Sequence, residues 1–158
     1  MKKLLVTLLV SIIFVSTVFS QSFIGEKKKV VLNDIKKSAI SIDKPIKDDK
    51  SDTYYIKVKF QTNTNWYSFT KDDVCYFYFI MQPYSLEKLN YYVQTYDNIY
   101  LRSFDKTELV WKEYKGDIFV YHWIVADYNR GYMYTVFLTK TNYDNNKYTY
   151  LQDFLGSK

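Results

Sequence analysis

Residues 74–81 read Val-Cys-Tyr-Phe-Tyr-Phe-Ile-Met, the most apolar run of the chain after its N-terminal segment. The run is rich in aromatic residues and lacks charge, glycine and proline, which is typical of a strand that meets little water on either face. Alternation along this strand predicts one face made of Cys75, Phe77, Phe79 and Met81. We therefore predict a central strand of a sheet, with the rest of the chain packed around it.

The first 20 residues have the layout of a signal peptide. Lys2 and Lys3 form a positive start, residues 4–15 are apolar apart from a threonine and a serine, and residues 18–20 end in a serine. The apolar run stops short of the roughly 18–20 residues that a membrane-spanning helix needs. This favours cleavage before Gln21 over an uncleaved membrane anchor, and we expect a secreted or periplasmic protein.

The rest of the chain has the composition of one packed domain, residues 21–158. Hydrophobic residues make up 47% of the sequence and aromatic residues 20%, with only 4 glycines and 2 prolines. Cys75 is the single cysteine, so the domain has no internal disulfide and no lipid-anchor cysteine at the cleavage site. The net charge is +5, or +3 without Lys2 and Lys3, and it is spread along the chain. We therefore expect no nucleic-acid partner.

Hydrophobic periodicity predicts two helices and six strands. The first helix covers residues 26–38, and the second begins at the N-cap residue Ser85 and ends near residues 97–98. Alternating segments and turn residues predict strands at 54–60, 66–69, 74–81, 109–114, 118–126 and 132–140. Residues 41–53, with Pro45 and a charged string, are predicted to form a solvated loop. The fold class is therefore α+β, with an antiparallel sheet of about six strands and the helices on one face.

The order of one helix and three strands occurs twice, in residues 23–81 and 83–140. The two units have nearly the same length, and both end in an aromatic strand. A tandem duplication explains this, and so does chance, because a helix covering an antiparallel meander is a common arrangement. Residue identity between the units does not decide between the two explanations.

The first unit resembles a known group of small envelope proteins. Phe23-Ile24-Gly25, followed by Lys28 and Val31 on a helix and then by a three-stranded meander, is similar to BamE/SmpA-like and β-lactamase-inhibitor-like domains. The tandem arrangement is closer to the inhibitor-like fold. The lipid-anchor cysteine of the assembly lipoproteins and the disulfides of the secreted inhibitors are missing here. The resemblance implies a non-catalytic role in binding a partner.

Few residues could carry chemistry. The chain has one histidine and one cysteine, so it lacks the several ligands of a zinc site, and we predict no metal site and no cofactor. His122 is interpreted as a strand residue with a solvent or hydroxyl partner. Cys75 is interpreted as a buried structural thiol, because no helix N-terminus or glycine-rich elbow accompanies it. The acidic pairs at 48–49 and 72–73, and residues 144–146, are interpreted as solvated turns.

The 18 tyrosines are the most unusual feature of the composition. Tyrosine combines a large contact area with a hydroxyl group, so an open strand face of tyrosines can bind a sugar, a peptide or a protein. The candidate ligand-binding residues on outward strand faces are Tyr55, Tyr67, Tyr76, Tyr78, Tyr132 and Tyr134. Strand propensity and nucleotide bias explain the same tyrosines without any ligand.

We therefore predict a secreted or periplasmic binding protein of bacterial type, not an enzyme, with a protein or glycan partner in the cell envelope. One alternative is a small hydrolase that uses Cys75 and His122 as nucleophile and base, or the carboxylates of the turns. Another is a purely structural envelope component.

Overall fold

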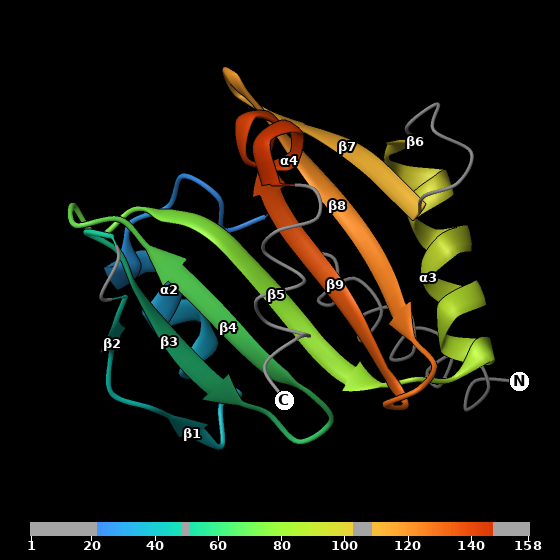
Figure 1. Cartoon of the computed structure of the whole chain (residues 1–158), viewed down its shortest axis with the longest axis horizontal. Coiled ribbons are helices and arrows are strands. Elements are labelled where there is room, and N and C mark those ends of the chain that lie inside the picture. The colour runs from blue at the N-terminus through green and yellow to red at the C-terminus, as the bar shows by residue number, and fades with distance from the viewer. Residues whose placement is uncertain (1–21, 49–50, 103–108, 147–158) are drawn as a thin grey trace, which may run out of the picture.

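The computed structural model describes residues 22–48, 51–102 and 109–146. They form one antiparallel sheet with three helices packed against it (Figure 1). The helices are α2 (Lys28–Ile35), α3 (Leu86–Ile99) and α4 (Lys140–Asn146). The strands are β1 (Ser41–Ile42), β2 (Ile46–Lys47), β3 (Tyr54–Lys59), β4 (Thr64–Phe69), β5 (Cys75–Pro83), β6 (Leu101–Arg102), β7 (Leu109–Lys115), β8 (Ile118–Asp127) and β9 (Tyr132–Thr139).

The strand order is β1-β3-β4-β5-β9-β8-β7-β6, and β2 pairs with β3 beside β1. The predicted central strand, β5, indeed lies in the middle of the sheet, where it pairs with β9. The described part of the chain has nine strands rather than about six. The three additional strands, β1, β2 and β6, have two residues each and only extend the two edges of the sheet. Such short pairings leave no periodic pattern in a sequence.

The six long strands and two of the helices lie where periodicity predicts them. In α3, the hydroxyl of Ser85 accepts a hydrogen bond from the backbone N–H of Lys88 (3.1 Å), which confirms the predicted N-cap. The predicted solvated loop at 41–53 contains β1 and β2, and the predicted turn at 144–146 lies in α4. The predicted signal peptide and an amphipathic turn predicted around Tyr150, Leu151, Phe154 and Leu155 lie outside the described residues.

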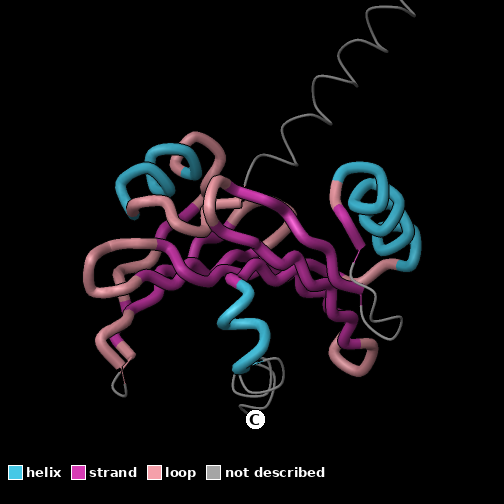
Figure 2. Tube along the Cα trace, turned by 90° about the horizontal axis from the view of Figure 1, so that it is seen from above, coloured by secondary structure: helices cyan, strands magenta, loops and turns pink. Residues whose placement is uncertain are grey.

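The helices lie on both sides of the sheet. Figure 2 shows two of them over opposite ends of one face and α4 below the middle of the other face. Val31 and Ile35 of α2 pack on β3, β4 and β5, whereas Leu89 and Tyr96 of α3 pack on β7, β8 and β9. Tyr143 of α4 packs on the opposite face. The prediction of helices on one face therefore holds for α2 and α3 only. Among the described residues, none of the helices combines the length and the apolar character needed to cross a membrane.

A β-bulge places Cys75 on the face of the sheet opposite to the predicted one. The pairing of β4 with β5 shifts between Ser68 and Phe69, so that Cys75 pairs with Phe69 but Phe77 already pairs with Ser68. The extra residue in β5 reverses the alternation at this point. Cys75 therefore packs in the core under α2, together with Tyr78, while Phe77 and Phe79 pack on the opposite face.

The two units of one helix and three long strands are arranged in opposite directions about the middle of the sheet. The first unit runs α2, β3, β4, β5 and the second α3, β7, β8, β9. Their last strands, β5 and β9, pair antiparallel, so the order β3-β4-β5 meets the order β9-β8-β7. The central strand pair is therefore the junction between the units.

Candidate functional site

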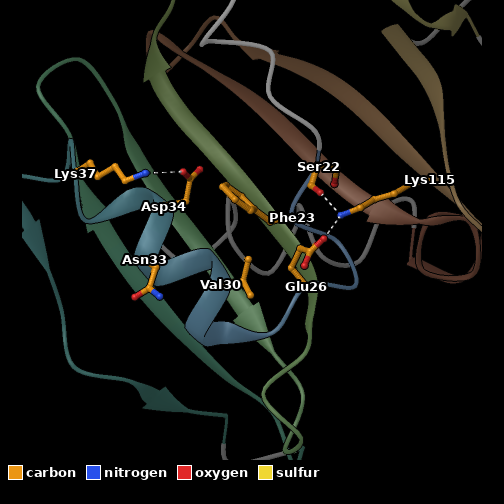
Figure 3. A pocket seen from close by; sticks show the side chains of 8 residues that line it. All are labelled: Ser22, Phe23, Glu26, Val30, Asn33, Asp34, Lys37 and Lys115. Atoms are coloured by element: carbon orange, nitrogen blue, oxygen red, sulfur yellow. Dashed lines mark hydrogen bonds and ion pairs between the residues drawn. The ribbon is translucent and has the colours of Figure 1, made fainter.

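An open pocket of about 690 Å³ lies beside α2 (Figure 3). The start of the described chain and the adjacent helix α2 build most of it, and the end of β7, which is distant in the sequence, completes it. We call it the α2 pocket, and its lining residues are Ser22, Phe23, Glu26, Val30, Asn33, Asp34, Lys37 and Lys115.

The helix contributes one of its sides to this pocket. Val30, Asn33, Asp34 and Lys37 follow the spacing that brings residues of a helix and its C-terminal turn to one side. Val31 and Ile35 lie on the buried side of the same helix. Val30 is therefore not part of the core, and it is 51% exposed. The one sequence signal for this site was an apolar residue, Val30, at a helix position outside the stripe of buried residues.

The chain before α2 is fixed in place by several contacts. Gly25 adopts a left-handed conformation with φ of 85°, and its N–H donates to the carbonyl of Cys75 (2.8 Å). The ring of Phe23 packs at 5.9 Å from the rings of both Tyr67 and Tyr78. Ser22 is only 1% exposed. The pocket wall formed by this segment is therefore part of the folded core.

The charges around the α2 pocket are paired. The Lys115 ammonium donates to the carbonyls of Ser22 (2.6 Å) and Ile24 (3.2 Å) and forms an ion pair with Glu26 (2.8 Å). On the other side, Lys37 lies 3.8 Å from Asp34. Figure 3 shows these two pairs with Phe23 and Val30 between them. The pocket therefore offers an apolar centre flanked by neutralised charges, which suits a ligand without net charge.

The structure places the six candidate tyrosines on both faces of the sheet and at different depths. Tyr67 and Tyr78 are buried under α2, and Tyr134 is buried on the opposite face. The expectation that these three point outward is therefore wrong, because Tyr67 and Tyr78 pack in the cluster with α2, and Tyr134 packs in the cluster that contains Tyr143 of α4. Tyr55 and Tyr76 are half-buried and Tyr132 is exposed. A role of these residues in ligand binding stays a prediction, but they do not form one open platform.

Cys75 and His122 have separate partners. The Cys75 thiol is fully buried and donates to the carbonyl of Phe77 at 3.8 Å, and burial raises its pKa to about 12. His122 is buried too, and its Nε2 atom lies 2.8 Å from the Glu113 carboxylate. The predicted solvent or hydroxyl partner of His122 is thus corrected to a buried carboxylate. Glu113 lies nine residues away in the sequence and faces His122 only because β7 pairs with β8.

Of the carboxylates at 72–73, that of Asp73 has a structural role. The Asp73 carboxylate accepts hydrogen bonds from the Tyr54 hydroxyl and from the Lys28 ammonium, the latter at 2.8 Å. These bonds, chiefly the one from Lys28, lower the pKa of Asp73. Within the described ranges, no three His, Cys, Asp or Glu side chains are grouped so that they could hold a metal ion.

Comparison with known proteins adds no identification. No family model matches the chain, and no curated protein or solved structure matches it either. The resemblance to small envelope domains therefore stays a prediction from the residues that carry it.

Proposed function

We propose that this protein is exported and binds a partner at the cell envelope through the α2 pocket, without catalysing a reaction. The observation that carries the proposal is the pocket itself, with the exposed Val30 and the half-buried Phe23 between two ion pairs. Apolar surface framed by polar groups is the usual composition of a binding site. The partner is a protein or a glycan that presents an uncharged, partly apolar group to the pocket.

Export is supported by the sequence of residues 1–20, and burial of the residues that follow is compatible with cleavage before Gln21. Ser22 and Ile24 are buried, so a cut after either residue would remove part of the core. Cleavage before Gln21 leaves the whole described domain intact. The mature protein then begins one residue before the wall of the α2 pocket.

The order of elements also supports a duplicated origin. Two units of one helix and three long strands meet at their last strands in the middle of the sheet. A duplicated αβββ unit would produce this arrangement, and the inhibitor-like proteins that the first unit resembles bind partners without catalysis.

The test combines localisation with a surface variant. Cell fractionation and N-terminal sequencing are expected to find the protein outside the cytoplasm with Gln21 as its first residue. Crosslinking in the producing cell is expected to yield a partner adduct that Val30→Lys reduces strongly. Leu86→Lys is the matched control, because Leu86 is an equally apolar, exposed helix residue away from the pocket.

Each outcome decides a part of the proposal. A protein that stays in the cytoplasm and keeps residues 1–20 would contradict export. Equal adducts for the wild type and both variants would exclude the α2 pocket as the contact. A stoichiometric complex that neither variant disturbs would favour a structural component of the envelope.

A further inference from the structure

A second pocket, of about 450 Å³, lies at the C-terminal end of α3. It is separate from the α2 pocket, and none of the described residues lines both. We call it the α3-end pocket, and its lining residues are Ile99, Tyr100, Leu101, Lys112, Glu113, Tyr114 and Phe119.

The α3-end pocket contains a carboxylate in a fixed position. The Glu113 side chain is 9% exposed, and one of its oxygens lies 2.8 Å from Nε2 of His122. The imidazole is itself held between aromatic rings, since its centroid lies 4.5 Å from that of Tyr100 and 4.7 Å from that of Phe137. A carboxylate that is held in this way needs no reorganisation to meet a positive charge.

Further negative potential comes from the backbone. The helix α3 has 14 residues and no basic residue in its last turn. The partial negative charge at its C-terminus is therefore not offset by a side chain of that turn. Ile99 and Tyr100, which end the helix, line the pocket. The pKa of the Tyr100 hydroxyl is raised to about 12, mainly by burial and then by the charge of Glu113.

The remaining walls are aromatic and aliphatic and are open to solvent. Tyr114 is 69% exposed, Leu101 79% and Phe119 49%, although large apolar side chains of a monomeric protein are usually covered. The rings of Tyr114 and Phe119 lie 5.3 Å apart. Aromatic faces attract weakly hydrated cations. Lys112, the one basic residue among the described residues of the lining, has its ammonium 5.5 Å from the ring of Tyr121, which packs in the core cluster on the α4 side of the sheet.

We propose that the α3-end pocket binds a small organic ammonium ion. Glu113 is the counter-ion, Tyr100, Tyr114 and Phe119 contact the alkyl groups around the nitrogen, and Ile99 and Leu101 contact the apolar part of the ligand. The carboxylate favours a cation over a neutral molecule. The aromatic rings favour an alkylated ammonium over a strongly hydrated metal ion.

The test uses two probes of the same shape. Choline and 3,3-dimethylbutan-1-ol differ only in that a positively charged nitrogen replaces a carbon. Isothermal titration or ligand-observed NMR with the purified protein is expected to show choline binding about tenfold more tightly than the alcohol. Glu113→Gln is expected to reduce this difference to about threefold, the part that the aromatic rings contribute.

A surface variant keeps the test decisive if Glu113→Gln does not fold, which circular dichroism would show. Tyr114→Leu changes only an exposed ring and is expected to weaken choline binding about threefold, leaving the alcohol unchanged. Tyr128→Leu is the matched control, since Tyr128 is a similarly exposed tyrosine that lies away from the pocket, in the turn between β8 and β9. Equal binding of both probes, binding of neither, or choline affinity unchanged in Tyr114→Leu would overturn the proposal.

Discussion

The ring of Tyr78 stacks on the ring of Phe137 in the middle of the sheet, with centroids 4.2 Å apart and planes 6° apart. The two residues are directly paired across β5 and β9, which are the last strands of the two helix-and-meander units. Both rings are buried in the cluster beneath α2. This contact joins the two units, so we expect it to contribute to the stability of the whole domain.

Replacing Phe137 by alanine should therefore lower the free energy of unfolding by about 3–5 kcal/mol, because it leaves a cavity at the junction. Urea unfolding followed by far-UV circular dichroism measures the change. Phe119→Ala is the control: this phenylalanine is half-exposed and its loss should cost less than about 1 kcal/mol. A similar decrease in the free energy of unfolding for both variants would show that the junction contributes no more to stability than an exposed position does.

Thr135→Val should stabilise the protein. The side chain of Thr135 is buried on β9, and its hydroxyl oxygen has no hydrogen-bond partner among the described residues. Valine keeps the branched shape and removes the unsatisfied group, so we expect the free energy of unfolding to rise by about 1 kcal/mol.

The same urea experiment tests this change, with Thr64→Val at a half-buried strand position as the control. The control should change stability by less than about 0.5 kcal/mol. A clear loss of stability in Thr135→Val would mean that the hydroxyl has a partner, such as a buried water molecule.

The contacts of Asp73 predict a dependence of stability on pH. Its carboxyl pKa is lowered in the folded state by the hydrogen bonds from Lys28 and Tyr54. A lowered pKa stabilises the fold above the ordinary value of about 4, and this contribution is lost as the pH falls through the lower, folded value. Asp73→Asn lacks the contribution at every pH.

The wild type should therefore unfold at a higher urea concentration than Asp73→Asn near pH 6, and the gap should narrow towards about pH 2. Asparagine also tolerates the left-handed backbone of residue 73, so the variant tests the charge rather than the conformation. Asp72→Asn, at the adjacent exposed carboxylate, should show no such gap. A gap that is constant with pH would contradict the assignment.

The Cys75 thiol should react slowly in the folded protein. It is fully buried, and burial raises its pKa to about 12, so the reactive thiolate is scarce at pH 8. Iodoacetamide labelling, followed by mass spectrometry, should be slow without urea and fast once urea unfolds the chain. Labelling of the folded protein at the rate of a free thiol would revive the hydrolase alternative.

Local sequence patterns were sufficient to predict the long strands and the helices α2 and α3. The spacing of Leu89, Val93 and Tyr96 and the cap at Ser85 predict α3, because a helix repeats every 3.6 residues and its first N–H groups need an acceptor. Alternation predicts β8 and places His122 opposite Trp123. The aromatic run at 74–81 predicts the central strand. Leu86 is the exception in α3, since it is exposed although it follows the same spacing.

The sequence alone thus determined the type and order of the long helices and strands, because periodicity and capping act between residues that are close in the chain. Only the tertiary structure decided which of these surfaces are covered and which residues meet. The bulge moves Cys75 to the other face, and pairing of β7 with β8 brings Glu113 to His122. Both pockets join segments that are distant in the sequence, such as Glu26 and Lys115. Contacts of this kind depend on register and packing between strands, which no local pattern encodes.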